Sequence, residues 1–239
     1  MSDGALKEDT GTVLIGCDLG QLQDFSAISV IRPIRNTRAV TTKGDNINRP
    51  YDAYDVFMTY QLFHLERFQS SYVEALDRIE AICQHPDICF DEKEVVMDAT
   101  GLGQPVTEMA ANRGLEVTPI IITGGEVPRF SDGRYFVPRT ELISCLIAIF
   151  QSERIKIALE LDLRQTLVDE LSSLTVKKRP SGTEVFETAK STQHDDMCIS
   201  LAMPLWIAEQ SSAQERVVID GFNERDYEQD DLLTWGLPR

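Results

Sequence analysis

The sequence lacks several features that define large classes of proteins. Its 239 residues contain no apolar run of about 18 residues, so neither a transmembrane helix nor a membrane partner is expected. The first ten residues are polar and carry acids, without the basic flank and apolar stretch of a secretory signal. The sequence also has no Gly-Lys-Ser/Thr phosphate-binding loop. We therefore expect a cytoplasmic protein without an ATPase site of that type.

Cysteine and histidine are scarce, at five and three residues. Cys83 and Cys89 flank His85, but this spacing fits no common zinc pattern, and no second pair completes four ligands. The other three cysteines lie in apolar segments, which is typical of buried, reduced thiols. Cysteine usage therefore agrees with a cytoplasmic protein and does not predict zinc.

Positive charge is also in short supply, because the formal net charge is −16. A protein that simply coats nucleic acid needs a positive surface, so this function class is disfavoured. A metal site built from carboxylates is compatible with the balance, since bound cations reverse the local sign of the charge. Part of the acidic excess lies in residues 209–239, which have eight acidic and three basic residues. We expect a solvated tail there, with docking on a basic partner as the alternative.

What the sequence does contain predicts one large domain over residues 12–208. Residues 1–11 are expected to be a flexible leader, and residues 209–239 an acidic C-terminal tail. Within the domain, β-rich apolar runs and helical spacing alternate as three strands, a helix, a strand, a helix and a strand, followed by helices and a hairpin. This order indicates a mixed α/β layer with a partly parallel sheet.

The boundaries of the elements follow from the same patterns. The predicted strands are residues 12–18, 25–31, 56–65, 95–98 and 117–122, and the predicted helices are residues 72–83, 105–112, 140–150, 161–171 and from 194 onwards. Ser70 and Ser71 are suited to cap the first helix. Polar residues predict loops at 33–54 and 126–138, and a hairpin is predicted over 174–187. Pro204 falls inside the last helix and should kink it.

The most informative residues are acids beside apolar runs. Asp18 closes the first strand and Asp98 a later one, and functional sites in open α/β sheets lie beyond the carboxyl ends of strands. If the two strands are parallel neighbours, about 4.8 Å apart, their carboxylates can share a metal ion. Asp195 and Asp196 open a helix, where acids are favoured. A helix start set over the same sheet edge would add a third carboxylate.

Carboxylates in this pattern point to divalent-metal chemistry. Mg²⁺ and Mn²⁺ prefer oxygen ligands, and two ions about 3.5–4 Å apart can hold the attacking water and the leaving oxygen of a phosphodiester. Each acid also has an ordinary structural role open to it. Asp18 could cap a turn, Asp98 could accept a hydrogen bond in the turn that follows, and Asp195 could form a capping box with Thr192.

Three segments resemble the nuclease motifs of phage large terminase subunits. Residues 16–20 (Gly-Cys-Asp-Leu-Gly), with 24–27 (Asp-Phe-Ser-Ala) behind them, resemble the first motif. Residues 96–103 (Val-Met-Asp-Ala-Thr-Gly-Leu-Gly) resemble the second, and 194–197 (His-Asp-Asp-Met) the third. No single motif is specific, so the resemblance rests on their order along most of the chain.

The resemblance implies a ribonuclease-H-like fold, with a mixed five-stranded sheet flanked by helices and an added C-terminal hairpin. It implies a metal-dependent endonuclease that cuts double-stranded DNA in genome packaging with two Mg²⁺ or Mn²⁺ ions. Asp18, Asp98 and one or both of Asp195 and Asp196 would be the catalytic metal ligands, with Asp24 supporting them. The implied partners are a packaging ATPase, a portal protein or a small terminase, in the bacterial host cytoplasm. Because the phosphate loop is missing, the likeness covers the nuclease part alone.

Bound DNA also needs cations and positioning groups. The candidates for phosphate contacts are Lys177, Lys178, Arg179, Lys190, Arg129, Arg134 and Arg139. Ordinary solvated surface bases are the alternative interpretation. His194 is a candidate to orient a water or a ligand from behind the acids, and a plain helix-end role is the alternative.

Two other classes of function stay open. Asp-Leu-Gly at the end of the first strand and Asp-Ala-Thr-Gly at 98–101 weakly resemble the phosphate loops of actin, Hsp70 and sugar kinases. That hypothesis gives the Asp195–Asp196 pair no role. The other is a non-catalytic packaging interaction module whose tail docks on a motor or portal protein, although retention of three acidic motifs argues against it. A junction resolvase of the same fold is a third, related alternative, distinguished by a preference for branched DNA.

Overall fold

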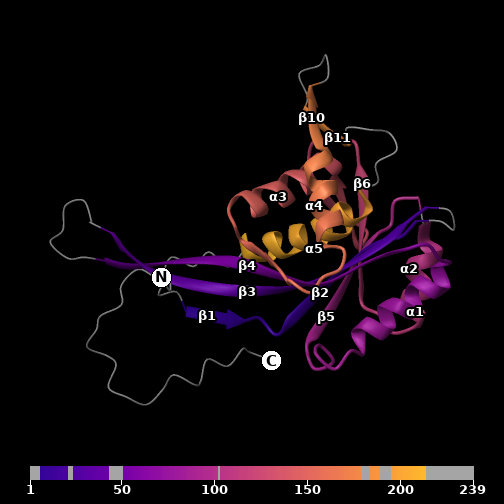
Figure 1. The fold of residues 1–239 in the computed structure, drawn as a ribbon, viewed down its shortest axis with the longest axis horizontal. Helices are drawn as coiled ribbons and strands as arrows, with labels where there is room; N and C mark the ends of the chain where they lie inside the picture. Colours follow the sequence, from indigo (N-terminus) through magenta and orange to yellow (C-terminus); the bar gives the residue numbers. More distant parts are fainter. Residues whose placement is uncertain are drawn as a thin grey trace.

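The computed structural model describes residues 6–20, 24–42, 51–101, 103–178, 184–188 and 195–213. Over these ranges the chain forms a mixed β-sheet with helices on both faces and a separate two-stranded hairpin (Figure 1). None of the helices in the described ranges is long and apolar enough to cross a membrane.

Parallel strands form the centre of the sheet. They are β2 (Thr12–Asp18), β5 (Glu92–Asp98) and β6 (Val117–Thr123), with β5 between the other two. β2 contributes Val13 and Ile15 to one hydrophobic core and Leu14 to the other. A strand buried on both faces needs apolar residues at nearly every position, which explains its uninterrupted apolar run.

The sheet extends on both sides of this centre. β3 (Ser26–Thr42) and β4 (Tyr51–Phe68) form a long antiparallel ribbon beside β2. The shorter strands are β1 (Leu6–Asp9), β7 (Arg129–Ser131), β8 (Arg134–Pro138) and β9 (Ile155–Ile157). The strand order is β7-β8-β6-β5-β2-β3-β4-β9, with β1 paired to β3. The separate hairpin consists of β10 (Leu174–Lys178) and β11 (Glu184–Thr188), close to its predicted position.

Helices cover both faces of the sheet (Figure 1). The helices on one face are α1 (Tyr72–Cys83) and α2 (Gly103–Asn112), and those on the other are α3 (Arg139–Gln151), α4 (Arg164–Ser173) and α5 (Asp196–Ala213). The predicted cap of the first helix is confirmed. Ser71 Oγ accepts a hydrogen bond from the Glu74 N–H, and the Glu74 carboxylate accepts one from the Ser71 N–H at 2.9 Å.

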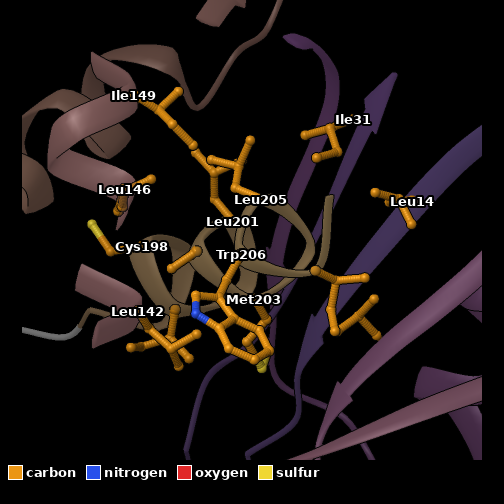
Figure 2. Close-up of a cluster of buried hydrophobic side chains, with 14 of the residues drawn as sticks. Leu14, Ile31, Leu142, Leu146, Ile149, Cys198, Leu201, Met203, Leu205 and Trp206 are labelled. Atoms are coloured by element: carbon orange, nitrogen blue, oxygen red, sulfur yellow. The ribbon is translucent and has the colours of Figure 1, made fainter. Parts of the chain in front are cut away.

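α5 is the middle layer between the sheet and α3. Every residue from Met197 to Ala208 is buried, and Figure 2 shows Leu201 and Leu205 in one cluster with Ile149 of α3 and Ile31 of β3. A helix that packs against other elements on all sides is expected to be apolar all round. Burial of α5 therefore fixes where its N-terminal residues lie relative to the sheet.

α5 approaches β2 at Gly16 so closely that no side chain fits between them. A Cβ at Gly16 would lie 1.8 Å from the Ser200 carbonyl oxygen and 2.6 Å from Cδ of Pro204. Pro204 has no N–H for the Ser200 carbonyl, and the Ser29 hydroxyl donates to that oxygen instead, at 2.8 Å. The helix consequently continues through Pro204, with a bond from β3 in place of the lost backbone bond.

Replacing Ser29 by alanine should lower the free energy of unfolding by about 1–3 kcal/mol, because the buried Ser200 carbonyl would lose its donor. Urea unfolding measures the change. Ser172→Ala is a matched control, since the Ser172 hydroxyl also donates to a helix carbonyl but is exposed. We expect this control to change stability by less than about 0.5 kcal/mol. Equal stability of the two variants would contradict the role given to Ser29.

Several sequence predictions differ from the structure. The predicted loops at 33–54 and 126–138 are wrong over much of their length, because they contain the outer β3–β4 ribbon and the β7–β8 hairpin. Residues 6–9 pair with β3 as β1, although they fall in the predicted flexible leader. Over the described residues the sheet therefore has nine strands instead of the predicted five. The two strands of an antiparallel ribbon satisfy each other's backbone hydrogen bonds and do not require an alternating apolar sequence. The polar residues of these segments therefore gave no strand pattern.

Candidate metal centre

Asp18 and Asp98 lie at the same edge of the sheet. β2 and β5 are parallel neighbours with Cys17 opposite Met97, and each aspartate is the last residue of its strand. The two backbones are about 4.8 Å apart, as for any adjacent strands. Both side chains are partly buried. The two strands thus meet the condition under which their carboxylates can share a metal ion, namely that they are parallel neighbours.

The Asp195–Asp196 pair reaches this edge from the start of α5. The Asp195 carbonyl accepts the hydrogen bond of the Ile199 N–H at 2.9 Å, so Asp195 is the N-cap residue and Asp196 the first residue of the helix. The negative charge of Asp196 lies close enough to Asp18 to raise its pKa. The packing of α5 on β2 thus brings the third acidic segment to the ends of the strands.

Burial and mutual repulsion characterise this group of acids. Burial raises the pKa of Asp18 well above its usual range, and the charges of Asp98 and Asp196 raise it further, while Arg139 opposes the shift. Burial also raises the pKa of Asp98, against the hydrogen bond that Asp98 Oδ1 accepts from the Thr100 N–H at 2.7 Å. This hydrogen bond is the structural role that the sequence allowed for Asp98, as an acceptor in the turn after β5. Asp98 therefore has that role and also belongs to the acidic group.

Two arginines supply counter-charge to the acids. Arg139, the first residue of α3, forms an ion pair with Asp195. Burial lowers the pKa of Arg139, and the nearby acids, Asp18 foremost, oppose that shift. Arg67 of β4 has its Nη2 atom 3.7 Å from Asp196 Oδ2, and its guanidinium lies over the Phe25 ring at 4.1 Å. Arg139, a candidate phosphate contact by sequence, is therefore engaged with the acids in this structure.

The donor set suits a hard divalent cation. Its carboxylates are partly buried and repel one another, and a bound cation would offset that repulsion. Within the described ranges, no three His, Cys, Asp or Glu side chains already converge into a metal-binding group. The acids are gathered at one edge but are not yet arranged as a closed cage.

Comparisons with known proteins bear on the fold. The sequence matches no protein-family profile and no curated protein. The large terminase nuclease from thermophilic phage G20c, with bound magnesium, is 22% identical over 81% of this chain and 80% of that chain, with a TM-score of 0.53. The same nuclease with bound cobalt gives the same values. The large terminase nuclease domain of Thermus phage P74-26 is 21% identical over 81% of this chain and 77% of that chain, with a TM-score of 0.50.

The chain has the fold of a phage large terminase nuclease domain. The terminase nuclease fold confirms the predicted ribonuclease-H-like α/β class. In this fold the acids at the ends of β2 and β5 and at the start of α5 occupy one edge, although Asp98 follows Asp18 by 80 residues and Asp195 follows Asp98 by 97.

Other residues singled out from the sequence lie elsewhere or outside the described ranges. Asp24 is exposed on the loop that follows β2. Arg129 begins β7, with its guanidinium over the Phe136 ring at 4.3 Å, and Arg134 begins β8. Lys177 and Lys178 end β10, of which the backbone is described. The remaining candidates lie outside the described residues, namely Arg179, Lys190 and His194.

Sequence reasoning missed Glu170 and Arg67. Glu170 of α4 is 4% exposed, with Oε1 3.4 Å from Arg67 Nη1 and Oε2 accepting the Cys198 N–H at 3.3 Å. Burial raises its pKa to about 7. One sequence signal was present, because Glu170 follows Leu167 by three residues and so lies on the same, buried face of α4.

Proposed function

We propose that the protein is a metal-dependent endonuclease that hydrolyses DNA phosphodiesters by a two-metal mechanism and cuts double-stranded DNA in phage genome packaging. The observation that carries the proposal is the meeting of three acidic segments at one sheet edge, on the fold of terminase nuclease domains. The ligands would be Asp18, Asp98 and one or both of Asp195 and Asp196.

Mg²⁺ or Mn²⁺ would be the resident ion. The oxygen-only donor set supports a hard cation, and the G20c nuclease has been solved with bound magnesium and with bound cobalt. Two such ions would lower the pKa of the attacking water and neutralise charge that develops on the scissile phosphate.

The chain's own residues would do the holding and orienting. Asp18 and Asp98 leave from neighbouring strand ends, and the sheet fixes their separation. Arg67 and Arg139 hold the acidic pair at the start of α5 by ion pairs. Arg129 and Arg134, on the sheet-edge hairpin, are proposed phosphate contacts. A packaging ATPase, portal protein or small terminase would present the DNA in the host cytoplasm.

A plasmid-cleavage assay tests the proposal. Purified protein is incubated with supercoiled plasmid in Mn²⁺, in Mg²⁺ or in EDTA, and nicked and linear products are quantified. We expect cleavage with a divalent ion and none in EDTA. The carboxylates alone supply no Lewis acid to polarise the phosphate and activate the attacking water. Intact plasmid with every ion, or cleavage that persists in EDTA, would overturn the proposal for the isolated protein.

A further inference from the structure

The start of α5 is capped by a residue from another helix. At an aspartate N-cap, the carboxylate usually turns back to accept an N–H from the second or third residue of its own helix. Here these residues are Met197 and Cys198, and the Cys198 N–H donates to Glu170 Oε2 at 3.3 Å. The Met197 N–H also opposes the rise in the pKa of the Glu170 carboxyl. Glu170 of α4 thus takes the place that the Asp195 side chain would occupy.

Asp195 is consequently directed elsewhere. Its carboxylate lies against the Arg139 guanidinium, which also feels the charges of Asp18 and Asp98. The second Glu170 oxygen faces Arg67, which bridges to Asp196 at 3.7 Å. Both Glu170 oxygens therefore already have partners, one in the backbone of α5 and the other in Arg67. Glu170 is placed to support the acids and not to bind a metal ion itself.

We infer that Glu170 is a positioning residue that caps α5 from α4 and so keeps the Asp195 carboxylate available to the metal centre. This inference rests on the proposed function, because it takes Asp195 as a metal ligand. Without an acceptor at position 170, the Asp195 carboxylate would turn back to accept the free N–H groups at the start of α5. It would then move away from Asp18 and Asp98. Groups that orient metal ligands from behind affect metal affinity by roughly 10–100-fold in other proteins.

Two substitutions separate the acceptor of Glu170 from its charge. Glu170→Gln keeps an oxygen that can accept the Cys198 N–H but removes the charge, whereas Glu170→Met keeps the length and removes the acceptor. Calorimetric titration with Mn²⁺, without DNA, measures the Kd of each variant. We expect Glu170→Gln to stay within about threefold of the parent and Glu170→Met to bind roughly tenfold or more weakly.

A matched control tests whether any substitution that destabilises α5 would weaken Mn²⁺ binding. Glu209 near the other end of α5 accepts hydrogen bonds from Tyr60 and from Arg154, the latter at 2.6 and 3.1 Å. Glu209→Met should lower the Tm without changing the Mn²⁺ Kd by more than about twofold, because it leaves the start of α5 intact. A Glu209→Met protein that loses Mn²⁺ affinity as Glu170→Met does would assign the effect to general loosening and overturn the inference.

The remaining outcomes are also decisive. Parental affinity in Glu170→Met, or equal loss in Glu170→Gln and Glu170→Met, would overturn the capping role. If Glu170→Met does not fold, the Gln variant decides alone, since a tenfold loss there contradicts the inference and parental affinity supports it. Asp195→Asn and Asp98→Asn, titrated alongside, identify failure of the proposed function, because parental Mn²⁺ affinity in both would remove the metal centre itself.

Discussion

Asp98→Asn should reduce plasmid cleavage by at least about 100-fold, which corresponds to about 2.7 kcal/mol of lost transition-state stabilisation. The amide keeps an oxygen for the Thr100 N–H, so the turn after β5 should survive. It removes the negative charge that the proposed cation needs. Initial rates at saturating Mn²⁺ measure the effect.

Stability supplies the internal check on this variant. Burial raises the pKa of Asp98 in the folded state, so the folded protein binds the proton more tightly than the unfolded chain does. Stability from this group is therefore lost as the pH rises through the folded pKa, and the buried charge is unfavourable at pH 8. Without metal at pH 8, Asp98→Asn should have a Tm equal to or above that of the parent. Cleavage at the parental rate would remove Asp98 from the site.

The matched control for Asp98→Asn is Asp169→Asn. Asp169 is exposed on α4, where its carboxylate accepts a hydrogen bond from Gln165. It undergoes the same chemical change outside the acidic edge, so its cleavage rate should stay within about twofold of the parent, as for a surface substitution worth less than about 0.5 kcal/mol. A similar loss in both variants would point to overall charge or purification effects.

Gly16→Ala should be the most damaging small substitution in the core. The new methyl group would meet the Ser200 carbonyl oxygen at 1.8 Å and the Pro204 ring at 2.6 Å, and both belong to a buried helix. Overpacking of a core costs about 1–3 kcal/mol, and contact with rigid backbone places this case at about 3 kcal/mol or more. At roughly 2–4 °C per kcal/mol, the Tm should fall by about 6–12 °C. Cleavage should fall too, since displaced α5 carries Asp195 and Asp196 away from β2.

Gly124→Ala provides the comparison for Gly16→Ala. A Cβ at Gly124 would have no heavy atom within 4 Å, and its backbone does not adopt a positive φ. Its Tm should therefore match the parent or rise slightly. A Gly16→Ala protein that melts within about 2 °C of the Gly124→Ala protein would mean that α5 and β2 separate easily, against the packing described above.

The acids at strand ends were predictable because each terminates a buried parallel strand. The residues just before Asp18 in β2 and just before Asp98 in β5 are apolar and buried, so each aspartate stands out in the sequence. The start of α5 was predictable for a similar reason, since the acids precede a long apolar segment. Sequence also indicated the helices and the β10–β11 hairpin.

Long-range pairing was beyond the sequence. Nothing in the polar segment after Ile31 indicates that β3 continues to Thr42, because pairing with β4 satisfies its backbone hydrogen bonds whatever its side chains are. Glu170 was missed for the opposite reason, since it is a buried acid in a helix whose other residues are largely polar. Its partners, Arg67 and the Cys198 N–H, come from β4 and α5, so only the packed structure reveals its role.

Under the proposed function, the acidic edge, where Arg139 pairs with Asp195, has a different net charge without and with bound metal. Without metal, two arginines face four aspartates, and the edge is negative like the rest of a chain with net charge −16. Two divalent ions would add four positive charges and reverse the sign at this edge alone. The acidic edge would then repel the phosphate backbone without metal and attract it once the ions are bound.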